Sequence, residues 1–444
     1  MKTILILGAG RSSSALITYL LQQAAINSWK IVIGDVSEAA AMQRLGGSRG
    51  KGVSFDINND DESVSIIQTA DVVISLLPAH LHVLVARHCL ALNKHLLTAS
   101  YVSDEMQEFH EEAKSKNILL LNECGLDPGI DHMSAMQVID KIKESGGTML
   151  SFDSFTGGLI SPETDSENPW RYKFTWNPRN VVMAGQGTAK FLQQGQYKYI
   201  PYHQLFKRIT NVTVPGYGEY EGYANRDSLK YLTTYGLQGI QSMLRGTLRN
   251  KGYCSAWDVL VQLGCCDDSY MIEGLERMTH RDFINAFLNY DSQLMVEEKL
   301  CLSFKLLPNG AEMQRLRWSG FFERELIGLQ EGTPAQVLEH ILNKKWKLKP
   351  EDKDMIVMWH RFVYEVRGAK KEIQASLIAT GDDSTYTAMA KTVGLPLGIV
   401  AKLLLQGKIN SRGVVIPVVK ELYDPILKEL EEIGIALTEI ETSL

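Results

Sequence analysis

Short apolar runs alternate with longer helical segments through the first 122 residues, and this alternation is the strongest constraint on the fold. The apolar runs lie at 3–7, 30–34, 53–56, 72–77, 95–99 and 118–122, and the helical segments near 12–25, 80–92 and 104–116. Nearly continuous Val, Ile and Leu strands separated by helices predict a parallel sheet that is covered on both faces. Right-handed crossover connections then favour the doubly wound α/β arrangement of a Rossmann domain.

A glycine-rich turn joins the first strand to the first helix and reads Gly8-Ala9-Gly10-Arg11-Ser12-Ser13. The dinucleotide fingerprint G-x-G-x-x-G/A belongs at this place, and Ser13 replaces its third glycine. Gly8 permits a tight turn, Gly10 lets the backbone approach a pyrophosphate, and the amides at the helix start carry positive partial charge. The turn therefore predicts a bound nicotinamide dinucleotide, with Leu77 and Pro78 after the fourth strand as further cofactor contacts.

Asp35 closes the second strand of the predicted sheet. An acidic side chain at this place receives the ribose hydroxyls of NAD and repels the 2′-phosphate of NADP. Asp35 therefore predicts a preference for NAD(H), with NADP(H) as the alternative. A turn aspartate beside a helix that starts at Ser37 is the structural alternative. Asp56, at the end of the third strand, is a candidate adenine neighbour or an ordinary turn residue.

Composition excludes several other classes of protein. The length of 444 residues predicts two or three domains. The net charge of −6 predicts no broad basic surface for nucleic acid. The six cysteines form no CxxC pair, and His80, His82 and His132 lack metal-ligand spacing, so we expect reduced buried thiols and no metal site. No run approaches the roughly 20 apolar residues of a membrane span. We expect a cytoplasmic protein without a membrane partner.

After residue 123 the strand–helix alternation ends. A Gly/Asp/Pro loop precedes a helix near 130–143 and a strand at 151–159, and the polar, aromatic region that follows to about 225 indicates an antiparallel sheet with long loops. Leu, Met and Phe recur at helical spacing from about 228 to 345, which indicates a mostly helical subdomain. The remaining expected elements are a strand at 372–381, a helix at 385–407, and a helix followed by a short strand over 417–444.

The segment 122–132, NECGLDPGIDH, follows the last predicted Rossmann strand, and ligands gather at this edge of open α/β sheets. Together with Leu77-Pro78-Ala79 and Thr98-Ala99-Ser100-Tyr101, it resembles the saccharopine dehydrogenase family. Four later segments are similar to the glutamate-forming branch of that family: 215–217 (PGY), 225–228 (NRDS), 245–249 (RGTLR) and 388–394 (AMAKTVG). The resemblance covers essentially the whole chain.

This resemblance implies an NAD(P)-dependent oxidoreductase of lysine metabolism that acts on a CH–NH group. Its substrate is saccharopine, in which the ε-nitrogen of lysine is bonded to the α-carbon of glutamate, and its products are glutamate and 2-aminoadipate 6-semialdehyde. The family residues that contact saccharopine match Ser100, Tyr101, Asp127, Arg226 and Arg245-Gly246-Thr247. The resemblance also implies a homodimer formed through the second domain. Members of the branch are mainly associated with NADP, which disagrees with the prediction from Asp35.

The residue types at these positions suit a substrate with three carboxylates. Arg226 and Arg245 are expected to clamp carboxylates, because guanidinium groups pair with them bidentately. Asp127 is expected to accept a hydrogen bond from the secondary ammonium and help remove its proton, and Tyr101 to orient the substrate or relay a proton. We assign no single compulsory acid–base residue, since close placement of the hydride donor supplies much of the acceleration. Salt-bridged surface arginines and a turn aspartate are the structural alternatives.

We therefore predict an α/β chain with two domains. A Rossmann domain at 1–124, with 385–444 packing back on it, precedes an α+β substrate-binding and dimerisation domain at 125–384 that carries the helical subdomain. Within the same superfamily, a carboxynorspermidine or carboxyspermidine dehydrogenase and a lysine dehydrogenase are the alternatives. A dinucleotide-binding regulatory protein without catalysis is the alternative of another class.

Overall fold

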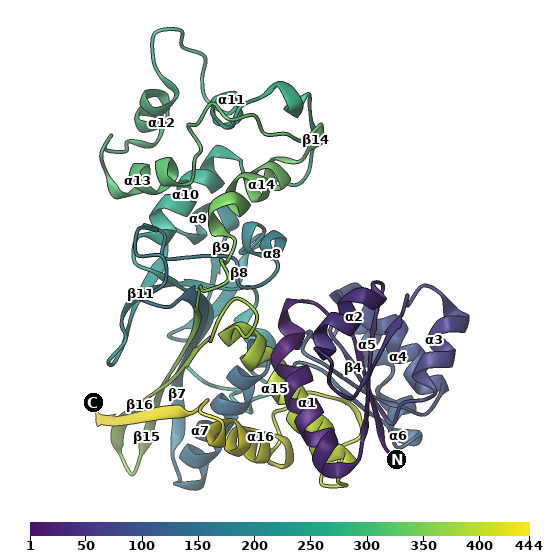
Figure 1. Ribbon diagram of the computed structural model, residues 1–444. Helices are drawn as coiled ribbons and strands as arrows, with labels where there is room; N and C mark the ends of the chain where they lie inside the picture. Colours follow the sequence, from purple (N-terminus) through teal and green to yellow (C-terminus); the bar gives the residue numbers. More distant parts are fainter. The chain divides into compact units, whose positions relative to one another are not determined.

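The computed structural model describes residues 1–444 and divides them into two compact units (Figure 1). The first unit comprises Met1–Met149, Tyr364–Lys371 and Leu377–Leu444, and the second comprises Leu150–Val363 and Glu372–Ser376. The first unit thus continues past residue 124 and includes the carboxyl-terminal segment. In the order of the chain, the second unit is an insertion between parts of the first.

A seven-stranded parallel sheet forms the centre of the first unit, in the order β17-β6-β5-β4-β1-β2-β3. Its strands are β1 (Thr3–Leu7), β2 (Lys30–Asp35), β3 (Lys51–Ser54), β4 (Val72–Ser75), β5 (His95–Thr98), β6 (Leu119–Leu121) and β17 (Gly413–Val415). Residues 4–7 have no exposed surface, as expected for a sheet covered on both faces. The predicted doubly wound sheet is confirmed, and β17 adds a seventh strand that the sequence pattern does not indicate.

Helices connect these strands and cover the sheet. They are α1 (Ser14–Asn27), α2 (Glu38–Leu45), α3 (Asp60–Ile67), α4 (His82–Ala91), α5 (Asp104–Glu108), α6 (His110–Ser115), α7 (Ile130–Glu144), α15 (Ala388–Leu405) and α16 (Lys420–Glu432), with 3-10 turns η1 (Arg11–Ser13) and η2 (Ala79–Leu81). The helix predicted near 104–116 is divided into α5 and α6 at Phe109. Otherwise the predicted helices of this unit are present.

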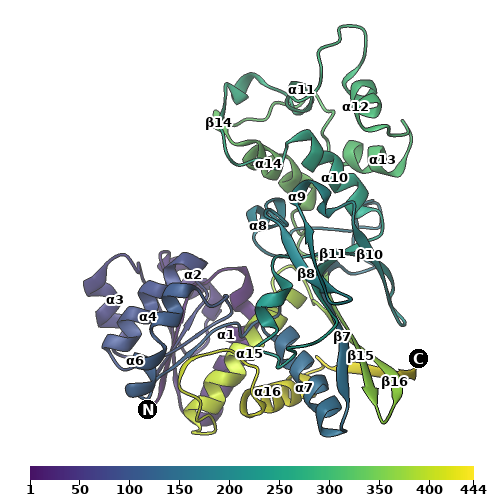
Figure 2. The ribbon, with the colours of Figure 1, turned by 180° about the vertical axis from the view of Figure 1, so that it is seen from behind.

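Helix α15 packs against α1, and both views show the two helices side by side (Figures 1 and 2). Two glycines permit this approach: a Cβ atom on Gly394 would lie 2.9 Å from Leu16 Cβ, and one on Gly398 would lie 2.7 Å from Tyr19 Cδ1. Helix α15 is the one helix that is long and apolar enough to cross a membrane. It is mostly buried inside the unit, as the core helix of a folded domain is.

A second sheet has nine strands in the order β10-β11-β12-β7-β15-β16-β18, with the hairpin β8–β9 beside β12. These strands are β7 (Thr148–Ile160), β8 (Ala189–Gln193), β9 (Gln196–Ile200), β10 (Ile209–Val214), β11 (Gly218–Ala224), β12 (Ser242–Asn250), β15 (Asp354–Val366), β16 (Ala369–Thr380) and β18 (Leu437–Ser443). Strand β12 pairs antiparallel with β11 but parallel with β7, so the sheet is mixed. The sequence predicts an antiparallel sheet here; β10–β11 and β11–β12 are antiparallel pairs, and the parallel pair β12–β7 is not predicted.

Most of the predicted helical subdomain is present in the second unit. The helices of the second unit are α8 (Pro178–Val182), α9 (Tyr202–Leu205), α10 (Tyr253–Leu263), α11 (His280–Ala286), α12 (Val296–Phe304), α13 (Ala311–Trp318) and α14 (Pro334–Trp346), of which α10 to α14 belong to this subdomain. The unit also contains the 3-10 turns η3 (Ser228–Tyr231) and η4 (Leu275–Arg277) and the short strand pair β13 (Ile272–Glu273) and β14 (Glu331–Gly332). The start of the predicted helical range, from 228 to 250, forms only the turn η3 and the strand β12. Gly236 and Gly239 adopt φ angles of 61° and 93° there, which end helical geometry before β12 begins.

All six cysteines are buried, and none forms a disulfide, as the sequence predicts. Burial raises the pKa of the Cys124 thiol, which adjoins the Gly/Asp/Pro loop. This cysteine therefore stays protonated and serves as a small apolar core residue.

Candidate active site

The glycine-rich turn lies at the carboxyl end of β1. Gly8 has a φ of 101°, and its N–H donates to the Gly34 carbonyl at 2.8 Å. No atom lies within 4 Å of the place where a Cβ on Gly10 would be, so the backbone is open to a ligand there. Ser13 is buried, and its hydroxyl donates to the Gly10 carbonyl at 2.8 Å, so a small side chain replaces the third glycine without loss of packing.

No side chain caps the helical turn that follows Gly10. Amides at such a helix start carry positive partial charge, and a pyrophosphate is the anion that the fingerprint binds there. The turn therefore fits a dinucleotide, and Arg11 and Ser12 belong to this first turn. Leu77 and Pro78 follow β4 at the same edge of the parallel sheet, where Leu77 packs half-buried against the core.

Asp35 ends β2, and both of its carboxylate oxygens accept backbone hydrogen bonds. The N–H of Ala9 donates to Oδ2 at 2.8 Å, and the N–H of Ser37 donates to Oδ1 at 3.0 Å. Ser37 caps α2 through a hydrogen bond from Ala40 N at 3.2 Å. Asp56 accepts from the backbone and side chain of Asn58, at 3.0 and 2.9 Å, which is the geometry of a turn residue. Its proposed contact with adenine stays a prediction.

His82, at the start of α4, joins two neighbouring strand ends. Its Nδ1 lies 2.9 Å from the Ser75 hydroxyl, and its Nε2 lies 2.8 Å from the Ser100 hydroxyl and 3.2 Å from that of Thr98. The ring is buried, and desolvation lowers the pKa of His82 to about 4, helped by the nearby His80. A neutral imidazole donates at one nitrogen and accepts at the other, so it fixes the direction of the hydrogen bonds that reach Ser100. Sequence spacing shows only that His82 is not placed as a metal ligand, and it does not reveal these contacts.

This burial predicts a pH-dependent loss of stability. Because the folded-state pKa of about 4 lies below the ordinary value of 6.5, the unfolded chain binds a proton that the folded chain excludes. The contribution is fully present above pH 6.5 and is lost as the pH falls towards 4, by about 3 kcal/mol. Urea unfolding of the native protein and His82→Asn should show that their difference in unfolding free energy shrinks over this window. A difference that is constant with pH would contradict the prediction; His95, which burial also shifts, is common to both proteins and cancels.

Tyr101 and Asp127 face each other where the loops after β5 and β6 meet. The Tyr101 hydroxyl lies 3.5 Å from Asp127 Oδ1, and both side chains are half-buried. The peptide bond between Asp127 and Pro128 is cis. The structure thus brings together Ser100, Tyr101 and Asp127, the candidate residues of the first unit, at the carboxyl edge of the parallel sheet.

A buried acid–histidine–acid group supports these loops, and sequence patterns do not reveal it. Glu123 Oε1 accepts from the Val102 N–H at 3.0 Å, and Glu123 Oε2 lies 2.8 Å from His132 Nε2. His132 Nδ1 lies 3.6 Å from Asp131, which accepts from the Gly129 N–H at 2.6 Å. These three side chains are almost completely buried. Glu123 begins the loop that carries Asp127, and it accepts a hydrogen bond from Val102, the residue after Tyr101. The group therefore ties the loop of Tyr101 to the loop of Asp127.

In the second unit, β12 and the loop after β11 carry the candidate arginines. The N–H of Asn225 donates to the Arg245 carbonyl at 2.9 Å, and the N–H of Arg245 donates to the Ser228 hydroxyl at 2.9 Å. The segments 225–228 and 245–249 are therefore held side by side. Arg226 is exposed with a φ of 51°, and the guanidinium of Arg245 lies 4.4 Å from the ring centroid of Tyr231.

The other residues of the RGTLR segment have different surroundings. A Cβ on Gly246 would lie 2.4 Å from the ring of Phe155, so this glycine is required for packing. Thr247 is half-buried and opposite Thr156 in the register of β12 and β7. Arg249 is buried, with its guanidinium 5.0 Å from the Tyr172 ring and 5.3 Å from the Tyr253 ring. Arg249 is thus a core cation, and Arg245 is the arginine of this strand that can serve a ligand.

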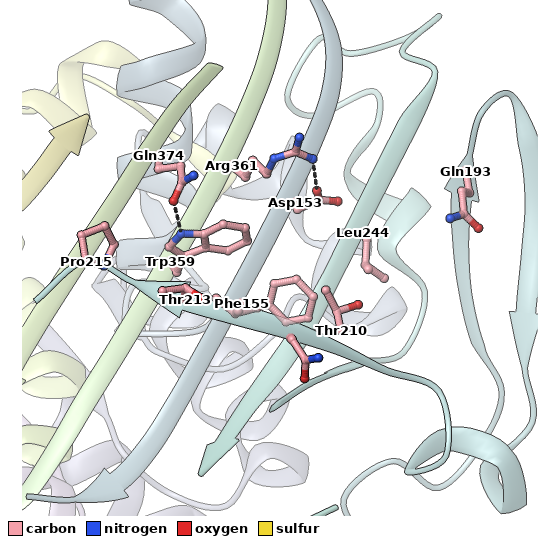
Figure 3. A pocket seen from close by; sticks show the side chains of 12 residues that line it. Asp153, Phe155, Gln193, Thr210, Thr213, Pro215, Leu244, Trp359, Arg361 and Gln374 are labelled. Atoms are coloured by element: carbon pink, nitrogen blue, oxygen red, sulfur yellow. Dashed lines mark hydrogen bonds and ion pairs between the residues drawn. The ribbon is translucent and has the colours of Figure 1, made fainter. Parts of the chain in front are cut away.

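A cavity of about 600 Å³ lies on the face of the second sheet opposite to the Arg245 side chain (Figure 3). Leu244 and Asp153 are register partners that line it, and Arg245, the next residue along β12, points to the other face. Burial raises the pKa of Asp153 to about 6, although Arg361 at 3.5 Å lowers it. None of the candidate site residues lines this cavity.

One cluster has residue types that bind metals: His280, Glu323 and Glu325. The ammonium group of Lys344 lies 3.1 Å from His280 Nε2 and 2.9 Å from Glu325 Oε1. A lysine ammonium therefore already supplies the positive charge among these ligands, and we assign no metal to them.

Two family models match almost the whole chain. Residues 4–121 match the saccharopine dehydrogenase NADP binding domain, and residues 125–435 match the saccharopine dehydrogenase C-terminal domain. The chain therefore belongs to the saccharopine dehydrogenase family, a family of oxidoreductases, as the GLDPGIDH, NRDS and RGTLR segments predict.

Similar curated proteins have two lengths. The chain is 36% identical over 451 residues to the mitochondrial alpha-aminoadipic semialdehyde synthase of Bos taurus, which covers 98% of this chain but 47% of that protein. The chain thus spans about half the length of that relative. It is 30% identical over 449 residues to the saccharopine dehydrogenase (NADP(+), L-glutamate-forming) of Schizosaccharomyces pombe, over 99% of both chains.

Solved structures agree with this family. The apo saccharopine dehydrogenase (L-Glu forming) of Saccharomyces cerevisiae matches with a TM-score of 0.90 and 29% identity over 100% of both chains. A homospermidine synthase from Legionella pneumophila, solved with NAD, matches with a TM-score of 0.55 and 10% identity, which shows a shared fold alone. The family model of the first domain and the Schizosaccharomyces pombe relative specify NADP, and they give no support to the preference for NAD(H) predicted from Asp35.

Proposed function

We propose that this chain oxidises saccharopine with NADP⁺ to release L-glutamate and 2-aminoadipate 6-semialdehyde. The observation that carries the proposal is the match to the yeast saccharopine dehydrogenase over the full length of both chains, at a TM-score of 0.90. The paired segments 225–228 and 245–249 add the guanidinium groups that a tricarboxylate needs. The polyamine-related alternatives have no comparable support, since the homospermidine synthase match is one of fold.

The reaction requires the protein to hold the three carboxylates of the substrate and to accept the proton of its secondary ammonium. Bound at the turn of Gly8 and Gly10, NADP⁺ would supply the acceptor for the hydride of the lysine-derived ε-carbon. Asp127 accepts the proton of the secondary ammonium, so that the nitrogen lone pair can form the C=N bond as the hydride leaves. Tyr101, whose hydroxyl lies 3.5 Å from Asp127, orients that carboxylate and the substrate nitrogen. Water then adds to the carbon of the C=N bond, and the C–N bond breaks to release glutamate.

Arg226 and Arg245 supply substrate binding in this proposal. Arg226 is exposed, whereas Arg245 is buried, with its guanidinium over the Tyr231 ring and its N–H donating to the Ser228 hydroxyl. Guanidinium groups bind carboxylates through two parallel N–H donors, which fixes orientation as well as affinity. Ser100, whose hydroxyl lies 2.8 Å from His82 Nε2, is a further proposed substrate contact.

Steady-state assays test the proposal directly. The purified chain should reduce NADP⁺ with saccharopine as substrate, release one glutamate for each NADPH, and turn over carboxynorspermidine and lysine far more slowly. Absence of turnover with saccharopine would contradict the proposed reaction. Binding of NADPH without any hydride transfer would favour a regulatory protein instead.

We also propose that the enzyme is a homodimer formed through the second unit, as the family resemblance implies. Light scattering should then give about twice the chain mass of 49.7 kDa. A mass equal to one chain at assay concentration would contradict the dimer and leave the proposed reaction unaffected.

A further inference from the structure

Arg44 contacts the glycine-rich turn from α2. Its Nε donates to the Ala9 carbonyl at 3.0 Å, and its Nη2 donates to the Gly10 carbonyl at 3.1 Å. The half-buried side chain forms no ion pair with a carboxylate. A guanidinium has five N–H donors, and two of them are used here, so three remain for a ligand. The turn thus holds a cation that forms no salt bridge with a protein carboxylate.

Asp35 contacts the same turn from the other side. Its carboxylate accepts the Ala9 N–H at 2.8 Å and the Ser37 N–H at 3.0 Å. Ala9 is therefore held at both of its backbone groups, by Asp35 at the N–H and by Arg44 at the carbonyl. Two amide donors also offset part of the negative charge of Asp35. This geometry is that of a group that fixes the shape of the turn.

We propose that Arg44 binds the 2′-phosphate of NADP(H) and that Asp35 braces the turn without selecting NAD(H). The inference rests on the proposed function, and it concerns only cofactor choice. In a Rossmann domain the adenosine ribose lies between the end of the second strand and the glycine turn. Arg44 provides a fixed guanidinium at this turn, and its planar fork matches a phosphate bidentately. Asp35 accepts the ribose 3′-hydroxyl in addition to its two backbone bonds.

Binding titrations without turnover test Arg44. NADPH and NADH are titrated by nicotinamide fluorescence, and 2′,5′-ADP and 5′-AMP by calorimetry, against the native protein, Arg44→Met and Arg49→Met. Arg49 is the matched control, because it is exposed and forms no hydrogen bond or ion pair. We expect Arg44→Met to weaken NADPH and 2′,5′-ADP at least tenfold while NADH and 5′-AMP change less than threefold. Arg49→Met should change none of the four affinities by more than twofold.

Arg11→Met distinguishes Arg44 from the other cation of the turn. If Arg11→Met loses the preference for 2′,5′-ADP over 5′-AMP and Arg44→Met keeps it, the assignment to Arg44 is overturned. If the native protein binds NADPH more tightly than NADH and Arg44→Met retains that ratio, the inference also fails, whereas the proposed NADP-dependent function stands. A native protein that prefers NADH would instead contradict the cofactor in the proposed function.

Asp35→Ser tests the second half of the inference. If Asp35 only fixes the shape of the turn, Asp35→Ser should weaken the binding of NADPH and NADH by similar factors, because both cofactors bind at the same turn. A selective gain in NADPH affinity of tenfold or more would show that Asp35 repels the phosphate, and would overturn its role as a brace. Circular dichroism and melting temperature verify that each variant is folded before titration.

Discussion

The Arg245→Met enzyme is expected to show a kcat/KM for saccharopine at least about 100-fold below that of the native enzyme, because a bidentate pair with a carboxylate is lost. Methionine keeps much of the side-chain volume over Tyr231, so the fold should be retained. The loss should appear mainly in KM if Arg245 binds substrate and transition state equally. Steady-state kinetics with varied saccharopine at saturating NADP⁺ measure both constants.

Two comparisons make this expectation specific. Lys251→Met removes an exposed cation just beyond β12 whose partner is the exposed Glu219, so it should change kcat/KM less than twofold. NADPH binding should be equal in all three proteins, because the glycine turn belongs to the other unit. Native kinetics in Arg245→Met would mean that Arg245 does not bind the substrate.

Gly129→Ala is expected to destabilise the protein by more than about 4 kcal/mol or to abolish soluble expression. A Cβ at this position would lie 2.1 Å from the Gly125 carbonyl oxygen and 2.2 Å from the Gly125 nitrogen, and the φ of Gly129 is 147°. Backbone atoms cannot move aside as a flexible side chain does, and Ile130 N also donates to that carbonyl at 2.8 Å. The loop that carries Asp127 would therefore have to open.

Gly146→Ala is the matched control at the other end of α7. Gly146 also has a positive φ, of 81°, but no atom lies within 4 Å of its Cβ position. Its substitution should cost only the conformational term, about 1 kcal/mol. Chemical unfolding of both variants measures the difference, and equal losses would show that the contact with Gly125 is unimportant.

Local sequence patterns predict much of the first unit. The strand residues are apolar and consecutive because both faces of the sheet are buried, and the glycine turn must follow the first of them. Strand β17 escapes prediction because Gly413–Val415 is three residues long and its partner, β6, lies almost 300 residues earlier. The region 228–250 was misjudged, because its apolar spacing is helical but two glycines and pairing with β7 determine its structure.

The candidate site is predictable only in part. The segments 122–132, 225–228 and 245–249, which resemble family motifs, predict Asp127, Arg226 and Arg245 as site residues. The structure adds how the backbone holds each of them. Glu123 and His132 meet through the path of a loop, and His82 reaches Ser100 across two strand ends, so no periodicity reveals either contact. Asp35 was interpreted without its neighbours: its hydrogen bonds to Ala9 and Ser37 are visible only in three dimensions.

The order of the chain in the two units has a consequence for biosynthesis. Strand β17 and helix α15 belong to the first unit, but a ribosome must produce all of the inserted second unit before either is made. During translation the parallel sheet therefore ends at β6, with an unpaired edge, and α1 lacks the helix that covers it. The first unit therefore reaches its complete sheet and helix cover only after residues 388–415 have been made.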